Sequence, residues 1–271
     1  FNYEQLIQEQ LVGQPNAVNA YIECCQRYVG LQKTALIWEG KNGESEQWSF
    51  EQLDVASAQV ANYFKSIGIQ VGDCIAGLLP RTPELLITIL ATWRIGAIYQ
   101  PLFTAFESKA IEHRVLTANT KLIVTNAEQR PKLNHVEVKH ILTVNAGTNL
   151  ASNEADFWQE AKQQSDQCEA VLRSFDDDFL MMFTSGTTGL AKSVPVPLKA
   201  VLAFKGYMQH AVDLREDDSF WNLADPGWAY GLYYGITGPL SLGHSIIMDE
   251  RAFSVDHAVE VIKKYRVSNL T

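Results

Sequence analysis

Twelve consecutive residues, 183–194, combine hydroxyls, glycines and one lysine in a pattern suited to binding phosphate. Glycines let backbone N–H groups converge on an anion, and hydroxyl and ammonium groups add further hydrogen-bond donors. The apolar residues 178–182 precede the segment and predict a buried strand that ends in this loop. The sequence therefore predicts a polyphosphate-binding loop whose binding residues are Thr184, Ser185, Gly186, Thr187, Thr188, Gly189 and Lys192.

The spacing of this loop differs from that of a Walker A loop. A Walker A loop has glycine directly before its lysine, whereas Ala191 precedes Lys192 here. A kinase or NTPase motor would need that lysine position and an acidic Mg²⁺ ligand as well. The remaining alternative is an ordinary Ser/Thr/Gly surface loop, and the density of donors after an apolar strand favours phosphate binding over it.

The segment resembles the signature loop of the adenylate-forming (AMP-binding) superfamily, which includes acyl-CoA synthetases, luciferases and non-ribosomal peptide adenylation domains. The usual pattern is Thr-Ser-Gly-Thr/Ser-Thr-Gly-x-Pro-Lys-Gly, and this chain matches it at positions 184–189 and at Lys192. It departs at Ala191, where proline is usual, and at Ser193, where glycine is usual. Losing the proline frees one φ angle, but neither departure removes a phosphate donor.

Two other segments resemble the same superfamily. Residues 93–102 are similar to its early helix-to-strand turn, in which Gly96 caps the helix and Pro101 ends the strand; we interpret this segment as architecture. Residues 221–231 resemble the Ala-Asp-x-Gly-Trp segment of acetyl-CoA and related short- and medium-chain acyl-CoA synthetases. The resemblance covers essentially the whole chain and would correspond to the first half of a longer enzyme.

The segment around Trp228 is a candidate wall of an acyl pocket, formed by Trp228, Ala229, Tyr230 and Gly231. Glycines among aromatics leave a backbone that a ligand can approach between large rigid surfaces. The alternative is a packed aromatic core. Acetate-selective relatives commonly carry Val-Thr after this tryptophan, so Ala229-Tyr230 leads us to expect a propionate-to-medium-chain acid instead of acetate.

The resemblance implies a two-step reaction that uses ATP, Mg²⁺ and CoA. A small carboxylic acid would attack ATP to give an acyl-adenylate, and CoA would then form the thioester. Lys192 would assist as a charge near the leaving pyrophosphate, whereas the main catalytic lysine of the superfamily lies in a later small domain. The adenine- and ribose-binding segments and the glutamate that usually holds Mg²⁺ are also expected outside this chain.

The chain is therefore predicted to be an N-terminal AMP-binding domain fragment, residues 1–271, that lacks the small C-terminal domain and is inactive alone. Arg130, with Lys132 beside it, is the candidate CoA-binding residue, and a solvated basic pair is the alternative. The rival functions are an amino-acid or aryl-acid adenylating enzyme of the same superfamily and, from another class, a nucleotide-binding pseudoenzyme or non-catalytic module. We expect no metal site formed by this chain.

Composition argues against two classes of protein, nucleic-acid-binding proteins and disulfide-stabilised secreted proteins. The net charge of −9 argues against nonspecific nucleic-acid binding, because no excess of basic residues exists to displace counterions from phosphates. Four cysteines without a C-x-x-C pair favour a reducing cytoplasm over a disulfide framework.

The chain starts at Phe1 without a signal-peptide pattern. Residues 85–102 contain Arg94 and residues 228–248 contain Pro239, so neither is expected to span a membrane. The sequence does not indicate an oligomeric state.

Short apolar strands alternate with amphipathic helices along the chain. Ser49, followed by Gln52 three residues later, forms a capping box, and Asn42-Gly43 predicts a hairpin turn. This alternation predicts an α/β fold with mostly parallel sheets covered by helices on both faces. The predicted strands are 34–39, 47–50, 74–79, 98–102, 121–125, 140–144, 178–182, 194–196 and 244–248. The predicted helices are 15–29, 50–67, one opening at Thr82-Pro83-Glu84, 108–118, 198–214 and 254–265, with a polar helical excursion at 145–178.

Overall fold

A seven-stranded sheet with the strand order β7-β6-β5-β3-β4-β8-β9 dominates the computed structural model of the chain. The structure describes residues 3–148, 150–184 and 189–271. All neighbouring strands run parallel except β8 and β9, which are antiparallel, so the prediction of a mostly parallel sheet is confirmed. The strands are β3 (Cys74–Leu78), β4 (Ile98–Pro101), β5 (Leu122–Asn126), β6 (His140–Val144), β7 (Glu154–Asp156), β8 (Asp178–Thr184) and β9 (Lys192–Pro197).

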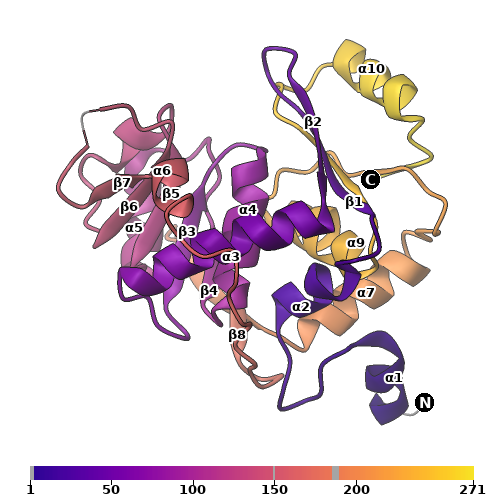
Figure 1. Cartoon of the computed structure of the whole chain (residues 1–271). Coiled ribbons are helices and arrows are strands. Elements are labelled where there is room, and N and C mark those ends of the chain that lie inside the picture. The colour runs from indigo at the N-terminus through magenta and orange to yellow at the C-terminus, as the bar shows by residue number, and fades with distance from the viewer. Residues whose placement is uncertain (1–2, 149, 185–188) are drawn as a thin grey trace.

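Helices pack on both faces of this sheet, as predicted (Figure 1). Ile75 joins the core formed with α3 (Phe50–Ser66) and α4 (Pro83–Arg94), whereas its neighbour Ala76 joins the core formed with α5 (Ser108–Thr117). Successive strand residues point to opposite faces, and both faces here are apolar and buried. A central parallel strand must be apolar on both sides for this reason.

A second group of elements packs beside the large sheet and shares its main core (Figure 1). Its two small sheets have the orders β11-β1-β2 and β10-β12. Their strands are β1 (Thr34–Glu39), β2 (Ser45–Ser49), β10 (Phe220–Trp221), β11 (Ile246–Asp249) and β12 (Asn269–Leu270). The remaining elements are α1 (Tyr3–Gln10), α2 (Ala20–Cys24), η1 (Gln26–Tyr28), η2 (Arg130–Leu133), α6 (Phe157–Ala161), α7 (Ala200–His210), α8 (Ala229–Leu232), the π-helix η3 (Tyr233–Thr237), α9 (Gly238–Ser241) and α10 (Val255–Tyr265).

The predicted capping box, the start of the last helix and the predicted hairpin turn are all confirmed by local hydrogen bonds and backbone angles. The Ser49 hydroxyl accepts a bond from the Gln52 amide at 3.2 Å, and the Gln52 side chain accepts one from the Ser49 amide at 2.8 Å. This is the predicted capping box, and α3 starts there. Ser254 accepts a bond from the His257 amide at 3.2 Å and caps α10 in the same way. Gly43 adopts a φ of +93° between β1 and β2, which glycine tolerates in a hairpin turn.

Two segments differ from the predictions because distant contacts capture their backbone. The helix predicted over 15–29 is reduced to α2 and the short η1. Val18 instead pairs with Arg173, and the Asn19 side chain donates to the Trp93 carbonyl at 2.7 Å. The segment 145–178, predicted as polar and helical, contributes β7 to the edge of the large sheet before the short α6.

Cys24, Cys25, Cys74 and Cys168 are all free and buried. Among the described residues, none of the helices combines the length and the hydrophobicity that crossing a bilayer requires.

Candidate active site

The predicted phosphate loop connects the two antiparallel strands β8 and β9. The register pairs Thr184, the last residue of β8, with Lys192, the first residue of β9. Both residues are exposed, and Gly189 between them adopts a φ of +98°. Ser185, Gly186, Thr187 and Thr188 lie outside the described residues. The hairpin therefore fixes the two ends of the predicted loop and holds the Lys192 side chain at its base.

Helix α5 packs against the loop end of this hairpin, at Phe183 and Ala191. His113 Nε2 lies 2.8 Å from the Ala191 carbonyl oxygen, and because a carbonyl only accepts, the imidazole donates this bond. The adjacent Arg114 guanidinium lies 5.7 Å from the centre of the Phe183 ring and 4.1 Å from that of Phe106. Burial lowers the pKa of Arg114, yet a guanidinium keeps its charge in proteins. One helix thus places an imidazole beside Ala191, the residue before Lys192, and a cation beside Phe183 of β8.

An aromatic cluster links Arg114 to the second predicted motif. The ring centre of Trp228 lies 5.5 Å from that of Phe106 and 5.4 Å from that of Phe103. Trp228 remains 45% exposed, so much of its indole surface is free to contact a ligand. Arg114 and Phe106 therefore connect the β8–β9 hairpin with Trp228, although Lys192 and Trp228 lie 36 positions apart in the sequence.

A tight turn fixes the position of Trp228. The Asp225 carboxylate accepts a hydrogen bond from the Gly227 amide at 2.7 Å, and the Trp228 amide donates to the Asp225 carbonyl at 3.0 Å. Burial raises the pKa of Asp225, against the opposing effects of that hydrogen bond and of the Arg81 charge. A Cβ atom on Gly227 would lie 2.7 Å from Phe103 Cα. Glycine at this position therefore lets the turn approach the aromatic cluster.

The expectation that Gly231 leaves a backbone open to a ligand is wrong on one side of the residue. Gly231 is buried, and a Cβ atom there would lie 2.3 Å from the Asp225 carbonyl oxygen. Its hydrogen atom on that side packs against the turn, so this glycine serves close backbone packing. Its membership of the acyl pocket stays a prediction.

Ala229 and Tyr230 begin α8 and are both exposed. The Tyr230 ring packs at 5.2 Å against Tyr234, which in turn stacks at 4.0 Å on Tyr207 of α7. Burial and a hydrogen bond with Tyr207 raise the pKa of Tyr230. Trp228 and Tyr230 thus contact two different aromatic groups, so the side chain of Tyr230 is held by α7 and not by the Phe103–Phe106 pair.

The candidate CoA-binding residue Arg130 lies past the carboxyl end of β5, beside a hollow of about 310 Å³. Its Nε donates to Glu154 at 3.0 Å and its Nη1 donates to Asn134 at 3.2 Å. Burial alone would raise the pKa of Glu154, but hydrogen bonds from Thr143 and Arg130 lower it overall. The carboxylate is therefore ionised at neutral pH and offsets part of the Arg130 charge.

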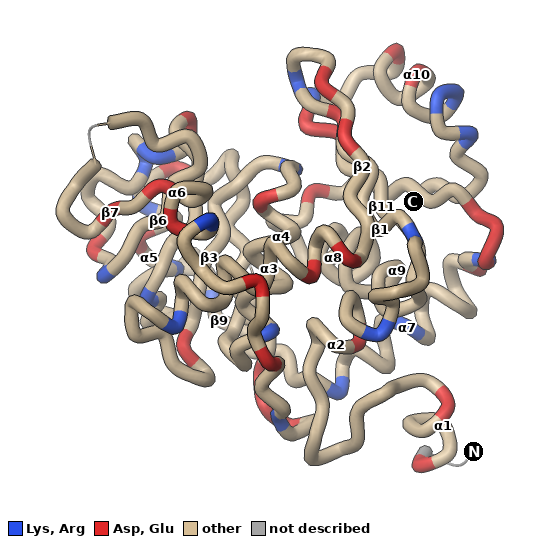
Figure 2. The backbone as a smooth tube through the Cα atoms, viewed as in Figure 1, with Lys and Arg blue, Asp and Glu red and all other residues tan. Residues whose placement is uncertain are grey.

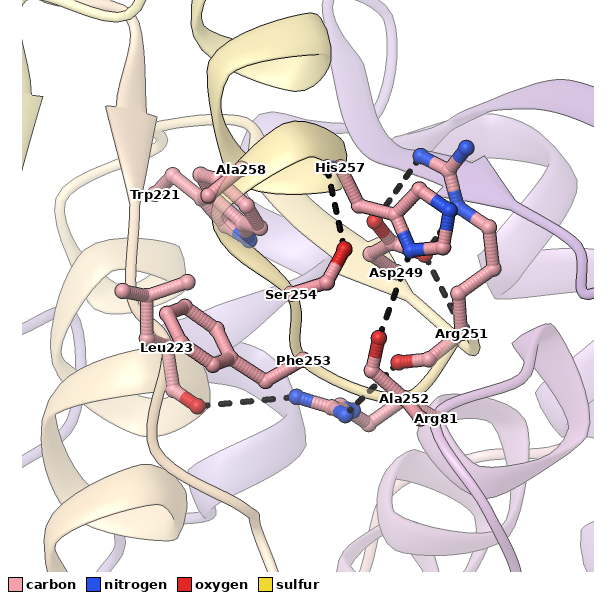
Figure 3. A pocket seen from close by; sticks show the side chains of 10 residues that line it. All are labelled: Arg81, Trp221, Leu223, Asp249, Arg251, Ala252, Phe253, Ser254, His257 and Ala258. Carbon is pink, nitrogen blue, oxygen red and sulfur yellow. Dashed lines mark hydrogen bonds and ion pairs between the residues drawn. The ribbon is translucent and has the colours of Figure 1, made fainter.

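A separate notch lies at the carboxyl ends of β10 and β11 and the start of α10 (Figure 3). Arg81 spans it by donating to the carbonyls of Leu223 and Arg251, while Asp249 holds the Arg251 guanidinium with bonds of 2.9 and 3.0 Å. Its interior of about 20 Å³ is room for about one water molecule. None of the binding residues predicted from the sequence lines it.

The sequence analysis did not single out His113 and Arg114, because it interpreted residues 108–118 only as a helix. It also missed Phe103 and Phe106, which lie between the predicted strand 98–102 and that helix. The two phenylalanines, three positions apart just after β4, were the available signal. Among the residues that the structure describes, no group of three or more His, Cys, Asp or Glu side chains is placed to hold a metal ion.

Comparisons with known proteins agree on one family. Residues 24–271 match the family of AMP-binding enzymes. The chain is 32% identical to an acetyl-coenzyme A synthetase of Deinococcus radiodurans, covering 95% of this chain and 43% of that protein. It is 29% identical to an acetyl-coenzyme A synthetase of Bacillus subtilis, covering 93% of this chain and 45% of that protein.

A solved structure is similar over the whole chain. The crystal structure of Brucella canis acyl-CoA synthetase aligns with a TM-score of 0.96 and 48% sequence identity, covering 100% of this chain and 50% of that one. The chain therefore spans about half the length of the relatives that it matches.

Proposed function

The chain belongs to the AMP-binding enzyme family, and we propose that the whole protein is an acid–thiol ligase that converts a small carboxylic acid to its CoA thioester. In the first step a carboxylate oxygen attacks the α-phosphorus of ATP, the bond to the β-phosphate oxygen breaks, and pyrophosphate leaves. In the second step the CoA sulfur attacks the acyl carbon, AMP leaves with the bridging oxygen, and the thiol proton passes to a base.

The observation that carries this proposal is the placement of the signature hairpin beside Trp228. Thr184 and Lys192 are the strand residues on either side of the predicted loop. Arg114 contacts Phe183 of β8 and Phe106 of the aromatic cluster, and so connects the two. In this proposal the loop binds phosphate next to a half-exposed indole, so an anion-binding subsite lies beside an apolar one. That combination suits a reaction in which an acid attacks a phosphate.

In this proposal Thr184, Ser185, Gly186, Thr187, Thr188, Gly189 and Lys192 hold the β- and γ-phosphates of ATP. Donors and positive charge at this place stabilise the negative charge that develops as pyrophosphate departs. The Mg²⁺ ion would enter with the nucleotide, because Mg²⁺ commonly binds substrate phosphates and keeps few protein ligands. It would neutralise part of the phosphate charge.

Arg130 is the proposed contact for a phosphate of CoA. It lies at the carboxyl edge of the parallel sheet, where ligands of α/β folds commonly bind, and a hollow adjoins it. Glu154 occupies its Nε and Asn134 accepts a bond from its Nη1, so Nη2 would meet the ligand. Trp228, Ala229, Tyr230 and Gly231 are the proposed acyl-pocket residues, with a propionate-to-medium-chain acid as the preferred substrate.

We further propose that the chain is the N-terminal half of a two-domain enzyme and produces no thioester alone, since it spans about half the length of its relatives. A cytoplasmic location and the absence of nucleic-acid binding stay predictions from composition. An amino-acid or aryl-acid adenylating enzyme is the alternative within the family. A nucleotide-binding protein without catalysis is the alternative outside it.

The test is product identification with the whole natural protein. Incubation with ATP, Mg²⁺, CoA and a series of straight-chain, aromatic and amino acids should release pyrophosphate and form an acyl-CoA that mass spectrometry identifies. Acid-dependent pyrophosphate release that never yields an acyl-CoA would favour the adenylating alternative. Nucleotide binding with no acid-dependent release would favour the non-catalytic one.

A further inference from the structure

An open groove on the surface of α3 has two tryptophans at its sides. Its floor is the outward face of the helix, and its volume is about 400 Å³. Trp48 at the end of β2 and Trp158 at the start of α6 face each other with nearly parallel rings, 6.4 Å between centres and 20° between planes. The lining residues are Trp48, Glu51, Gln52, Val55, Ala56, Gln59 and Trp158.

Both indole N–H groups are already bound to carboxylates. Trp48 Nε1 donates to Glu46 at 2.8 Å, and Trp158 Nε1 donates to Glu84 at 2.9 Å. The indole N–H groups are therefore satisfied. Both rings are partly buried against the main core, so the parts of their faces that line the groove are what remains to interact. A hydrogen bond to an anion adds electron density to a ring, so each face attracts a cation more strongly than a free indole would.

A third carboxylate lies in the groove itself. Glu51 is held by the backbone amides of Gly30 at 2.7 Å and Gln32 at 3.3 Å. Backbone hydrogen bonds, together with one involving Ser49, lower the pKa of Glu51, so it is charged at neutral pH. Figure 2 shows acidic positions along β2 and on α3.

None of these three glutamates is neutralised by a basic side chain in the part of the chain that the structure describes, since the ion pairs found there involve other residues. Val55 adds an apolar surface that is 42% exposed, and the Gln59 amide makes no hydrogen bond with any described residue. The groove thus offers flat aromatic faces, an apolar floor, a free amide and uncompensated negative charge. This combination is complementary to a side chain that is positively charged, planar and partly apolar.

We propose that this groove binds an arginine side chain of a protein partner. A planar guanidinium stacks on indole faces and donates to a carboxylate through its fork of N–H groups, while its aliphatic stem covers apolar surface. Lysine offers a strongly hydrated point charge and no plane to stack. An anionic lipid surface is repelled by the three carboxylates. The inference does not depend on the proposed ligase function.

The test measures the indole N–H signals of the ¹⁵N-labelled chain by NMR during titration with a short, otherwise uncharged peptide that carries one arginine. The control peptide carries citrulline, which keeps the shape and removes the charge. The arginine peptide should shift the Trp48 and Trp158 signals saturably, and the citrulline peptide should leave them in place.

Two matched variants locate the binding. Glu51→Gln removes the groove's own charge and should weaken peptide binding by about fivefold, the scale of one exposed ion pair. Glu137→Gln makes the same change at an exposed position outside the groove and should bind like wild type.

Three results would overturn the proposal: equal shifts with citrulline, unchanged binding in Glu51→Gln, or shifts of the two signals with protein concentration alone. The last would assign the groove to a contact between copies of the chain.

Discussion

Replacing Gly231 by alanine tests how the turn before α8 holds Trp228. The new Cβ would lie 2.3 Å from the Asp225 carbonyl oxygen, 2.5 Å from its carbonyl carbon and 2.8 Å from the Ala224 carbonyl oxygen. All three are backbone atoms, so no side-chain rotation relieves the overlap. Overpacking of a buried site costs about 1–3 kcal/mol, and we expect Gly231→Ala to lower the free energy of unfolding by that amount.

Gly206→Ala is the matched control. Gly206 lies inside α7, and a Cβ atom there would meet nothing within 4 Å. Alanine in a helix interior is favoured over glycine by about 0.5–1 kcal/mol, so this variant should be more stable than wild type. The assay is equilibrium urea unfolding of both variants with equal m-values. Equal stability of the two variants would refute the assignment of Gly231 to close packing against the turn.

Three further outcomes follow from the described contacts. Burial holds the pKa of Lys205 at about 8, below its usual 10.5, so between these pH values the unfolded chain binds more protons than the folded chain. The free energy of unfolding of the wild type, measured in urea relative to that of Lys205→Met, should therefore rise as the pH increases from 8 to 10.5. Arg114→Met removes its cation–π contacts with Phe106 and Phe183, so the free energy of unfolding should fall by about 0.5–2 kcal/mol, and an unchanged value would contradict those contacts. Ala229→Val adds bulk beside Trp228, and since one methylene is worth about 1–3 kcal/mol in such a pocket, the ratio of kcat/KM for acetate over longer acids should increase in the whole protein; an unchanged ratio would exclude this position from chain-length selection.

Local features of the fold were predictable because the residues that create them are close in sequence. The capping box of Ser49 and Gln52 sets the start of α3 through two bonds across three positions. The strand over residues 34–39 and the alternation of apolar strands with helices followed from periodicity alone. The same alternation gave the mostly parallel sheet.

Features that depend on distant pairing were missed. The pairing of Val18 with Arg173 replaces most of a predicted helix, and β7 forms only because β6 offers an edge. Propensity within a short window does not contain these partners.

In the candidate site, too, contiguous motifs were predictable from the sequence and contacts between distant positions were not. The signature loop and the Trp228 segment are contiguous motifs, so the sequence was sufficient to single them out. Arg114 and Phe106 join the two motifs from separate positions, and only the packing of α5 against the hairpin reveals their part. The roles assigned to the individual binding residues stay predictions until they are tested.

The central claim is that the predicted loop between β8 and β9, together with Lys192, holds the phosphates of ATP. Acid-dependent exchange of pyrophosphate into ATP by the whole natural protein tests this claim most directly. Lys192→Ala should raise the activation barrier by about 2–4 kcal/mol, or about thirtyfold to a thousandfold in rate, the scale for losing one preorganised charge-stabilising donor. Lys263→Ala, at an exposed position on α10, is the control and should exchange at the wild-type rate. Wild-type exchange by Lys192→Ala would contradict the account.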